Sequence, residues 1–263
     1  MNRSDKIIFI IGYSRSGTKM MSDLLEKTGL ILRPPEIHFF GGLYNPKNEM
    51  DLLPIKRTLK HISNIQEKGL HYSYPLSKAE ITTIVEKRFN NNKTAPAVEI
   101  YLSYFSYLIS KYNKHLFLDA TPRNIYYLDY LLKTFPQARF IYMLRDPRDN
   151  ALSQKVKYKK YINRNKLEAL RLFFNYHPYN VAKMWKNSLK NYKKNRNDKV
   201  KLVRYEDLTS QPEKELKEVF DFLKVPYNSE IAASIRKNNT NKWQRGLKKW
   251  EISLLEKRLH TEI

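Results

Sequence analysis

The chain has 263 residues, and its 49 Lys and Arg against 26 Asp and Glu give a formal net charge of +23. Such an excess favours an anionic partner: a nucleotide, a nucleic acid, an acidic glycan or a membrane surface. The absence of cysteine excludes disulfides and thiol chemistry. We find no signal peptide and no apolar run of about 18 residues, the length of a membrane span. A cytoplasmic protein is the default expectation, and a piece of a membrane-anchored enzyme is the alternative.

Short apolar runs alternate with helical patterns along the chain, which is typical of a parallel sheet covered by helices on both faces. We therefore predict a three-layer α/β/α fold with a central, mostly parallel sheet, as a single domain over residues 1–263 without repeats or linkers. The predicted strands are 6–11, 30–32, 115–119, 139–144 and 199–203. The predicted helices are 18–28, 77–90, 97–112, 121–135, 167–194 with a break near His177-Pro178, 212–223 and 251–259.

The first strand leads into a loop that predicts phosphate binding. The apolar run 7–11 ends at Gly12, a short polar loop follows, and an amphipathic pattern starts at Thr18. A strand, a glycine-bearing turn and a helix N-terminus bind phosphate, because free backbone N–H groups and the helix dipole point at the anion. Arg15 adds a full positive charge in the same loop. The chain is therefore expected to bind a phosphorylated nucleotide.

The last residues of this loop indicate which class of nucleotide the chain binds. Gly12 and Gly17 have the spacing of the ATP/GTP loop, G-x-x-x-x-G-K-[ST], but Thr18-Lys19 inverts its last pair. The inversion moves the cation by about 100° around the helix. Residues 14–18, Ser-Arg-Ser-Gly-Thr, instead resemble the 5′-phosphosulfate loop of sulfotransferases, which reads Arg/Lys-Ser-Gly-Thr. That family uses 3′-phosphoadenosine-5′-phosphosulfate as its donor.

A second motif lies at the end of the predicted strand 139–144. Arg145 and Ser153 are eight residues apart, and the proline at 147 ends the strand so that a helical segment returns Ser153 toward Arg145. An arginine and a serine can then bind one phosphate together. This spacing resembles the 3′-phosphate site of the sulfotransferases. The alternative is an Arg/Asp ion-pair cluster at a strand end.

Two later segments also resemble the family. Residues 203–208, Val-Arg-Tyr-Glu-Asp-Leu, match a Tyr-Glu-Asp-Leu segment, which places Tyr205 near the nucleotide and gives Asp207 a capping role. Residues 242–247 resemble the loop that closes over the 3′-phosphate and adenine, with Trp243 stacking and Arg245 bonding phosphate. The family's fuller lysine- and glycine-rich form of this loop is absent. The alternative for Tyr205 and Trp243 is plain packing.

The resemblance covers residues 7–40, 115–153, 199–226 and 240–259, and it implies sulfuryl transfer from 3′-phosphoadenosine-5′-phosphosulfate (PAPS) without a metal. Arg15 is the candidate for neutralising charge on the bridging oxygen, and Lys19 is a weaker one. The implied donor-binding residues are Ser14, Arg15, Ser16, Gly17, Thr18, Lys19, Arg145, Ser153, Tyr205, Trp243 and Arg245.

An acceptor hydroxyl needs a general base. Glu36-Ile37-His38-Phe39-Phe40 resembles the Glu-x-x-Phe-Phe segment of glycan sulfotransferases, whose glutamate is the base. Glu36 is therefore the expected base and His38 the alternative. The resemblance favours a carbohydrate acceptor over another small metabolite. The structural alternative pairs Glu36 with an arginine and packs His38 against the aromatics.

Other parts of the acceptor site are left open. Asp119-Ala120 replaces a lysine that relatives often carry, so only Arg123 is a candidate for orienting the acceptor. Several aromatic and basic residues either line the acceptor pocket or belong to solvated loops. They are Tyr72, Tyr74, Tyr158, Tyr161 and the lysines between 155 and 166.

Two other functions remain as alternatives. The first is a nucleotide-dependent kinase with a degenerate phosphate loop, which predicts binding of ATP and Mg²⁺. The second is a non-enzymatic basic protein that binds polyanions with a steep salt dependence. No nucleic-acid motif supports the latter, so nucleic acid is not an expected partner.

Overall fold

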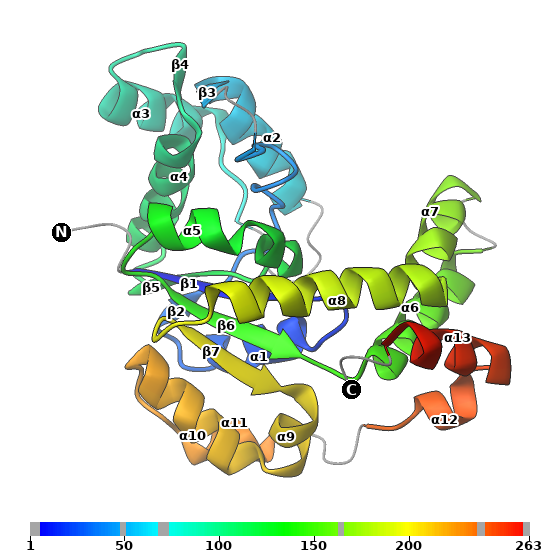
Figure 1. Ribbon diagram of the computed structural model, residues 1–263. Coiled ribbons are helices and arrows are strands. Elements are labelled where there is room, and N and C mark those ends of the chain that lie inside the picture. Colours follow the sequence, from blue (N-terminus) through cyan, green and yellow to red (C-terminus); the bar gives the residue numbers. More distant parts are fainter. Residues whose placement is uncertain (1–5, 48–50, 68–73, 163–165, 236–239, 260–263) are drawn as a thin grey trace. The chain divides into compact units, whose positions relative to one another are not determined.

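The computed structural model describes residues 6–47, 51–67, 74–162, 166–235 and 240–259; of Lys166 and Glu168 it describes only the backbone. Its central sheet has five strands in the order β2-β5-β1-β6-β7 (Figure 1). Strands β1 (Ile7–Gly12) and β2 (Ile31–Leu32) each pair in parallel with β5 (Leu116–Asp119). With helices alternating along the chain, this confirms the predicted α/β class with a central, mostly parallel sheet.

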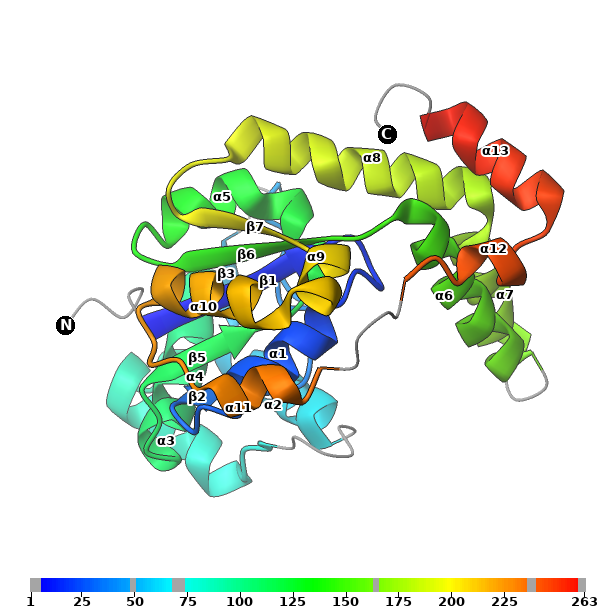
Figure 2. The same cartoon turned by 90° about the horizontal axis from the view of Figure 1, so that it is seen from below.

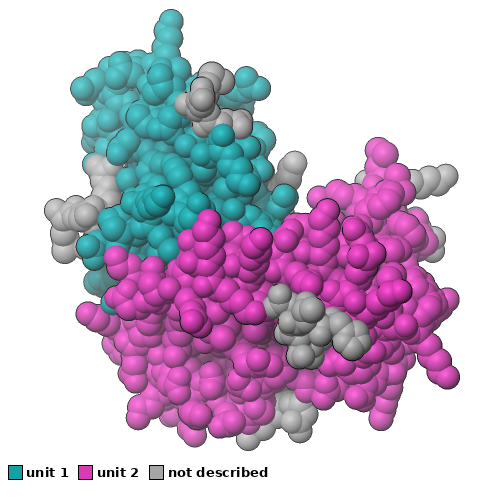
Figure 3. Space-filling model, viewed as in Figure 1, with its two compact units in different colours: residues 1–11, 19–141 teal, residues 12–18, 142–263 magenta. Residues whose placement is uncertain are grey.

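The chain divides into two compact units (Figure 3). Unit 1 comprises residues 1–11 and 19–141, and unit 2 comprises residues 12–18 and 142–263. The division cuts β1 after Ile11 and β6 (Arg139–Leu144) after Ile141. The loop that follows β1 therefore belongs to the same unit as the segment that follows β6. The single domain over residues 1–263 stays a prediction.

Unit 1 has an aromatic core. Phe9 on β1 stacks on Phe140 with ring centroids 4.9 Å apart, and Phe40, Tyr101 and Phe135 lie around them, all 2% exposed or less. The helices of this unit are α1 (Thr18–Glu26), whose first residue is in unit 2, α2 (Ile55–Glu67), α3 (Lys78–Phe89), α4 (Ala97–Lys111) and α5 (Leu128–Thr134). Ser77 is the N-cap of α3, as its sequence predicts, and it forms a capping box with Glu80.

The structure differs from the sequence prediction at three places in unit 1. The predicted helix 121–135 starts as a 3₁₀ helix, η2 (Pro122–Tyr127), and becomes α5 only afterwards. Thr121 makes no side-chain cap; its own N–H donates to Asp119 Oδ1 at 3.0 Å, and its carbonyl oxygen accepts the Asn124 N–H at 3.1 Å. The antiparallel pair β3 (Leu52–Pro54) and β4 (Thr94–Pro96) and helix α2 were not predicted. These strands are too short for their alternation of apolar and polar residues to be recognised.

Unit 2 is mainly helical apart from β7 (Val200–Arg204) and the ends of β1 and β6. Figure 2 shows the long helix α8 (Pro178–Asn195) packing against α13 (Lys249–Leu259), while α6 (Pro147–Tyr161) packs against α7 (Lys166–Tyr176). The break predicted near His177-Pro178 is confirmed, because His177 is the N-cap of α8 and Pro178 its first residue. The remaining helices are α9 (Tyr205–Ser210), α10 (Pro212–Leu223), α11 (Ser229–Ala233) and α12 (Trp243–Gly246).

Within the described ranges, no helix combines the length and the apolar character needed to cross a membrane. A cytoplasmic location stays a prediction from the sequence.

Candidate active site

The loop between β1 and α1 turns tightly at two glycines. Gly12 lies so close to the next strand that a Cβ there would meet the Met143 carbonyl oxygen at 2.5 Å. Gly17 has φ +99°, and a Cβ on it would lie 2.6 Å from the ring of Tyr205. Arg15 adopts a positive φ of 72° between them. Glycine adopts positive φ readily and other residues rarely do, so at Arg15 the contacts with Ser153 and Arg145, rather than local preference, favour this backbone conformation.

The predicted 5′-phosphate and 3′-phosphate motifs meet in unit 2. Arg15 Nε donates a hydrogen bond to Ser153 Oγ at 2.9 Å. Arg145 Nη1 donates to the Arg15 carbonyl oxygen at 3.2 Å. The structure thus brings together three residues that the sequence assigned to two separate motifs. We call Arg15, Arg145 and Ser153 the cationic cluster.

Arg145 packs against an aromatic ring, and its ion pair with Asp149 is a long one. Its guanidinium carbon lies 4.2 Å from the centroid of the Tyr205 ring, and its nearest carboxylate oxygen, on Asp149, is 4.0 Å away. Its Nε is buried and has no hydrogen-bond partner among the described residues. The Trp185 indole N–H donates to its carbonyl at 2.9 Å and fixes its backbone. A buried, unused donor on an arginine is costly unless an anion accepts from it.

Helix α6 carries the other contacts to the loop. Asp146 caps this helix by accepting the Arg148 N–H at 2.7 Å, and Pro147 occupies the first helical position. One turn on, Asn150 donates to Ser16 Oγ at 3.2 Å, and both side chains are fully buried. The Asn150 Oδ1 atom is buried without a hydrogen-bond partner among the described residues. Sequence reasoning missed Asn150, although it lies in the quoted segment 139–153.

Asp149 joins the start of α6 to the late segment of the chain. It is 2% exposed and accepts the backbone N–H groups of Asn241 at 2.9 Å and Trp243 at 3.1 Å. The Trp243 ring lies 4.1 Å from the guanidinium carbon of Arg148. The Asp146 carboxylate, hydrogen-bonded to Arg148, raises the pKa of that guanidinium further. Asp149 was not predicted as a site residue. Its partners Asn241 and Trp243 lie 92 and 94 residues away in the sequence, and only these contacts reveal that it anchors the late segment.

The other predicted donor-site residues have varied surroundings. Ser14 is half-buried, Thr18 is 5% exposed at the start of α1, and Tyr205 is 5% exposed against Gly17 and Arg145. Lys19 is 74% exposed and forms an ion pair with Asp23 at 2.7 Å. Arg245 is exposed on α12, and no described hydrogen bond or ion pair joins it to the cationic cluster.

The candidate bases Glu36 and His38 belong to unit 1. His38 Nε2 lies 3.5 Å from Glu36 Oε2, and the two side chains are 51% and 44% exposed respectively. Ile37 and Phe39 alternate with them and are buried, whereas Glu36 and His38 are exposed. His38 is a close neighbour of Glu36, and the rings of Phe39 and Phe40 pack edge-on with centroids 5.1 Å apart.

Unpaired buried polar groups gather after β5 in unit 1. Asp119 is satisfied, since it accepts from the Tyr101 hydroxyl at 2.9 Å and from the Thr121 N–H. Thr121 Oγ1 and both amide atoms of Asn124 are buried and have no hydrogen-bond partner among the described residues. Arg123 between them is exposed. The carboxyl end of a parallel strand is where α/β proteins bind ligands, which makes these groups candidates for contact with a ligand.

The tyrosines predicted to line the acceptor pocket have different surroundings in the structure. Tyr158 stacks on Tyr176 with ring centroids 5.1 Å apart, and Tyr74 meets Tyr112 edge-on at 4.9 Å. These contacts indicate packing. Tyr161 is half-buried at the end of α6, and Tyr72 lies outside the described residues. In the part of the chain that the structure describes, no three His, Asp or Glu side chains are grouped to bind a metal ion.

The family model described as the sulfotransferase family matches residues 8–229. This chain belongs to the sulfotransferase family. Its match includes the loop after β1, the cationic cluster and Tyr205. A search of curated proteins found no match.

Solved structures with a similar fold are also sulfotransferases. The sulfotransferase domain of the Synechococcus PCC 7002 olefin synthase is 20% identical over 95% of this chain and 93% of that one, with a TM-score of 0.55. The domain from the curacin biosynthetic pathway is 20% identical over 95% and 89%, with a TM-score of 0.52. Retinol dehydratase, solved with androsterone and the inactive cofactor PAP, is 16% identical over 98% and 80%, with a TM-score of 0.51. At these identities the likeness shows the fold of this sulfotransferase.

Proposed function

We propose that the protein transfers a sulfuryl group from PAPS to a hydroxyl of an acceptor, with a carbohydrate as the favoured acceptor class. The observation that carries the proposal is the meeting of Arg15, Arg145 and Ser153 within one unit. Two arginines and a serine hydroxyl at one place suit a ligand with more than one phosphate. The solved retinol dehydratase with bound PAP, a relative of similar fold, supports the same ligand class here.

The residues present fit such a donor. The donor carries a sulfuryl group on its 5′-phosphate and a separate 3′-phosphate. Arg145 offers a buried, unused Nε–H, and the single bond from Arg15 Nε to Ser153 leaves the Nη donors of Arg15 for an anion. The backbone of Gly17 and Thr18 at the start of α1 supplies further N–H donors. We assign Arg145 and Ser153 to the 3′-phosphate and the loop 14–18 to the 5′-phosphosulfate.

Arg15 and Glu36 take the chemical roles in this proposal. Arg15 neutralises the charge that develops when the sulfuryl group leaves, an effect that preorganised cations supply without a metal. Glu36 accepts the proton of the acceptor hydroxyl, and His38, 3.5 Å away, orients its carboxylate or replaces it. Thr121 and Asn124 of unit 1, with their unused polar atoms, are proposed to bind acceptor hydroxyls.

A kinase with a degenerate phosphate loop is disfavoured. The lysine that such an enzyme needs is Lys19, whose ammonium group forms an ion pair with Asp23 at 2.7 Å. The inverted Thr18-Lys19 pair accounts for this, since it turns the lysine away from the position that reaches the phosphates.

A thermal-shift titration tests the donor assignment. Adenosine 3′,5′-bisphosphate is expected to raise the melting temperature at micromolar concentration, as a specific ligand of the folded state must. ATP with Mg²⁺ and 5′-AMP are the matched comparisons. A larger shift with ATP and Mg²⁺ than with the bisphosphate would refute the proposal in favour of the kinase.

A further inference from the structure

Helix α8 has two faces with different partners. Its inner face holds Trp185, which is 5% exposed and donates to the Arg145 carbonyl of the cationic cluster. Its outer face holds Lys183, Lys190 and Lys194, all exposed. At 100° per residue, Lys183 and Lys190 lie on the side of the helix opposite to Trp185. What binds the outer face is therefore separate from the donor site.

A cavity of about 300 Å³ lies where this outer face meets α13. Its lining consists of Tyr179, Lys183, Lys186 and Asn187 from α8 and Arg258 from α13, with no carboxylate among them. The Arg258 guanidinium carbon lies 4.6 Å from the centroid of the Tyr179 ring, and Lys186 Nζ donates to the Arg258 carbonyl at 3.3 Å. Three cations are thus collected around one hollow, where their mutual repulsion favours a bound anion. We call these five residues the α8–α13 pocket.

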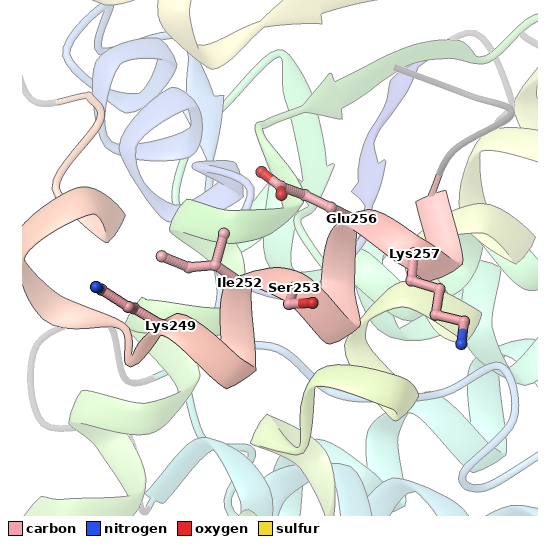
Figure 4. Close-up of a pocket in the computed structure, with 5 residues that line it drawn as sticks. All are labelled: Lys249, Ile252, Ser253, Glu256 and Lys257. Carbon is pink, nitrogen blue, oxygen red and sulfur yellow. The ribbon is translucent and has the colours of Figure 1, made fainter.

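A hollow along α13 itself serves as a contrast (Figure 4). It is larger, about 380 Å³, and is lined by Lys249, Ile252, Ser253, Glu256 and Lys257. Its lining includes the carboxylate of Glu256 beside two lysines, and Glu256 also forms an ion pair with Arg148 at 3.3 Å. With two lysines and one glutamate, its lining has a smaller excess of positive charge than the three cations of the α8–α13 pocket, so it gives a weaker reason for an anion to bind.

The positive charge continues beyond the α8–α13 pocket along the same helix. Lys190 and Lys194 follow Lys183 at spacings of seven and four residues, which places them on one face. The distance from Lys183 to Lys194 along the helix axis is roughly 16 Å at 1.5 Å per residue. From Ala169 to Asn197 the sequence contains no Asp or Glu at all. The outer face of α8 therefore suits a ligand with repeated negative charges.

We propose that the α8–α13 pocket and the lysines that follow it bind a linear acidic glycan, with one sulfate or carboxylate of the chain in the pocket. Between the cations, the Tyr179 hydroxyl and the Asn187 amide can exchange hydrogen bonds with sugar hydroxyls. Nucleic acid is bound instead through phosphate contacts together with stacked or edge-read bases, and the α8–α13 pocket contains one aromatic ring, already covered by Arg258. That this glycan is the acceptor of the sulfuryl group rests on the proposed function. That the glycan binds to the α8–α13 pocket does not depend on the proposed function.

Binding to immobilised dextran sulfate, dextran and a DNA duplex tests the proposal. The variant Lys183→Gln/Arg258→Gln removes one lysine and one arginine from the α8–α13 pocket. The matched control, Arg57→Gln/Lys60→Gln, removes one of each from exposed positions on α2. We expect the pocket variant to bind dextran sulfate about tenfold more weakly, because it loses two charge-assisted contacts. We expect the control to stay within about twofold and dextran not to bind.

Each other outcome overturns the proposal. An equal loss in both variants would mean that net charge alone binds the polymer, and no loss in either would mean that the ligand lies elsewhere. A DNA duplex that binds as tightly as dextran sulfate and is lost in the same variant would assign the pocket to nucleic acid. The single variant Lys183→Gln, expected to show a smaller loss, covers the case in which Arg258→Gln unfolds the end of α13.

Affinity for adenosine 3′,5′-bisphosphate, measured on the same proteins, separates this inference from the proposed function. It is expected to be unchanged in the pocket variant. If the wild-type protein binds dextran sulfate through the α8–α13 pocket but not the bisphosphate, the donor assignment fails and the glycan site stands.

Discussion

Arg15 Nε donates a hydrogen bond to Ser153 Oγ at 2.9 Å across 138 residues of sequence. The bond joins the loop after β1 to the second turn of α6, and both segments belong to unit 2. Arg145 binds the carbonyl of the same Arg15, so the three residues form one cluster. Each segment follows the carboxyl end of a strand of the sheet, where α/β proteins bind ligands, which is why we propose the cluster as the binding site of the doubly phosphorylated nucleotide.

Ser153→Ala is expected to weaken binding of adenosine 3′,5′-bisphosphate by about tenfold, because a hydroxyl donor to a charged phosphate is lost. Arg145→Lys is expected to cost more, about tenfold to a hundredfold, since lysine cannot supply the guanidinium fork or its buried Nε–H. Isothermal titration measures both. The control ligand is 5′-AMP, which lacks the 3′-phosphate and should bind each variant as it binds the wild type. Equal losses for 5′-AMP would contradict the 3′-phosphate assignment.

Glu36→Gln is expected to lower kcat by about 10²–10⁴-fold, the range for loss of a general base. Affinity for the bisphosphate should change by less than about twofold, since Glu36 is proposed to act on the acceptor. His38→Gln is the matched variant, and a smaller loss is expected if His38 only orients Glu36. A larger loss in His38→Gln would exchange the two roles, and loss of bisphosphate binding in Glu36→Gln would refute the assignment.

Asp149→Ala is expected to lower the free energy of unfolding by about 2 kcal/mol, because two partly buried backbone N–H groups lose their charged acceptor. The segment that carries Trp243 loses its anchor to α6, so bisphosphate affinity should fall as well. Urea unfolding followed by tryptophan fluorescence measures the first effect, and titration the second. Asp129→Asn, an exposed carboxylate in the first turn of α5, is the control and should change neither. Unchanged affinity in Asp149→Ala would separate this segment from the donor site.

Glu80 makes part of the stability of unit 1 depend on pH. Although burial opposes its ionisation, hydrogen bonds from Lys111, Ser77 and Tyr107 lower the pKa of its carboxyl from 4.5 to about 2. A carboxyl whose pKa is lower in the folded state stabilises that state above pH 4.5, and this contribution is lost as pH falls from 4.5 toward 2. Glu80→Gln is expected to lower the free energy of unfolding at pH 7 by about 1–2 kcal/mol, allowing for solvent screening of this partly exposed group.

The difference between Glu80→Gln and the wild type should then shrink as unfolding is measured at successively lower pH. Glu86→Gln, an exposed carboxylate on the same helix, is the control and should follow the wild type throughout. A deficit in Glu80→Gln that is independent of pH would mean that the amide disturbs packing instead.

The local part of the fold was predictable wherever a pattern was long or carried a distinctive residue. Strand β6 and helix α10 have the predicted bounds, and Pro178 and Ser77 began their helices as expected. Helix α2 was missed, although Ile55, Leu59 and Ile62 have helical spacing and are fully buried. The 3₁₀ start after Thr121 was missed because the Thr-Pro pair does not distinguish an α-helix from the tighter turn in which the Asn124 N–H donates to the Thr121 carbonyl.

The sequence by itself determined the phosphate loop, the Arg145–Ser153 motif and the family they resemble, because those features depend on residues near one another in the chain. Only the tertiary structure decided that Arg15 lies against Ser153, that Asp149 anchors Asn241 and Trp243, and that the α8–α13 pocket exists. The physical reason is that these contacts join segments up to 138 residues apart. Their geometry is set by how the strands and helices pack, which no local pattern of residues encodes.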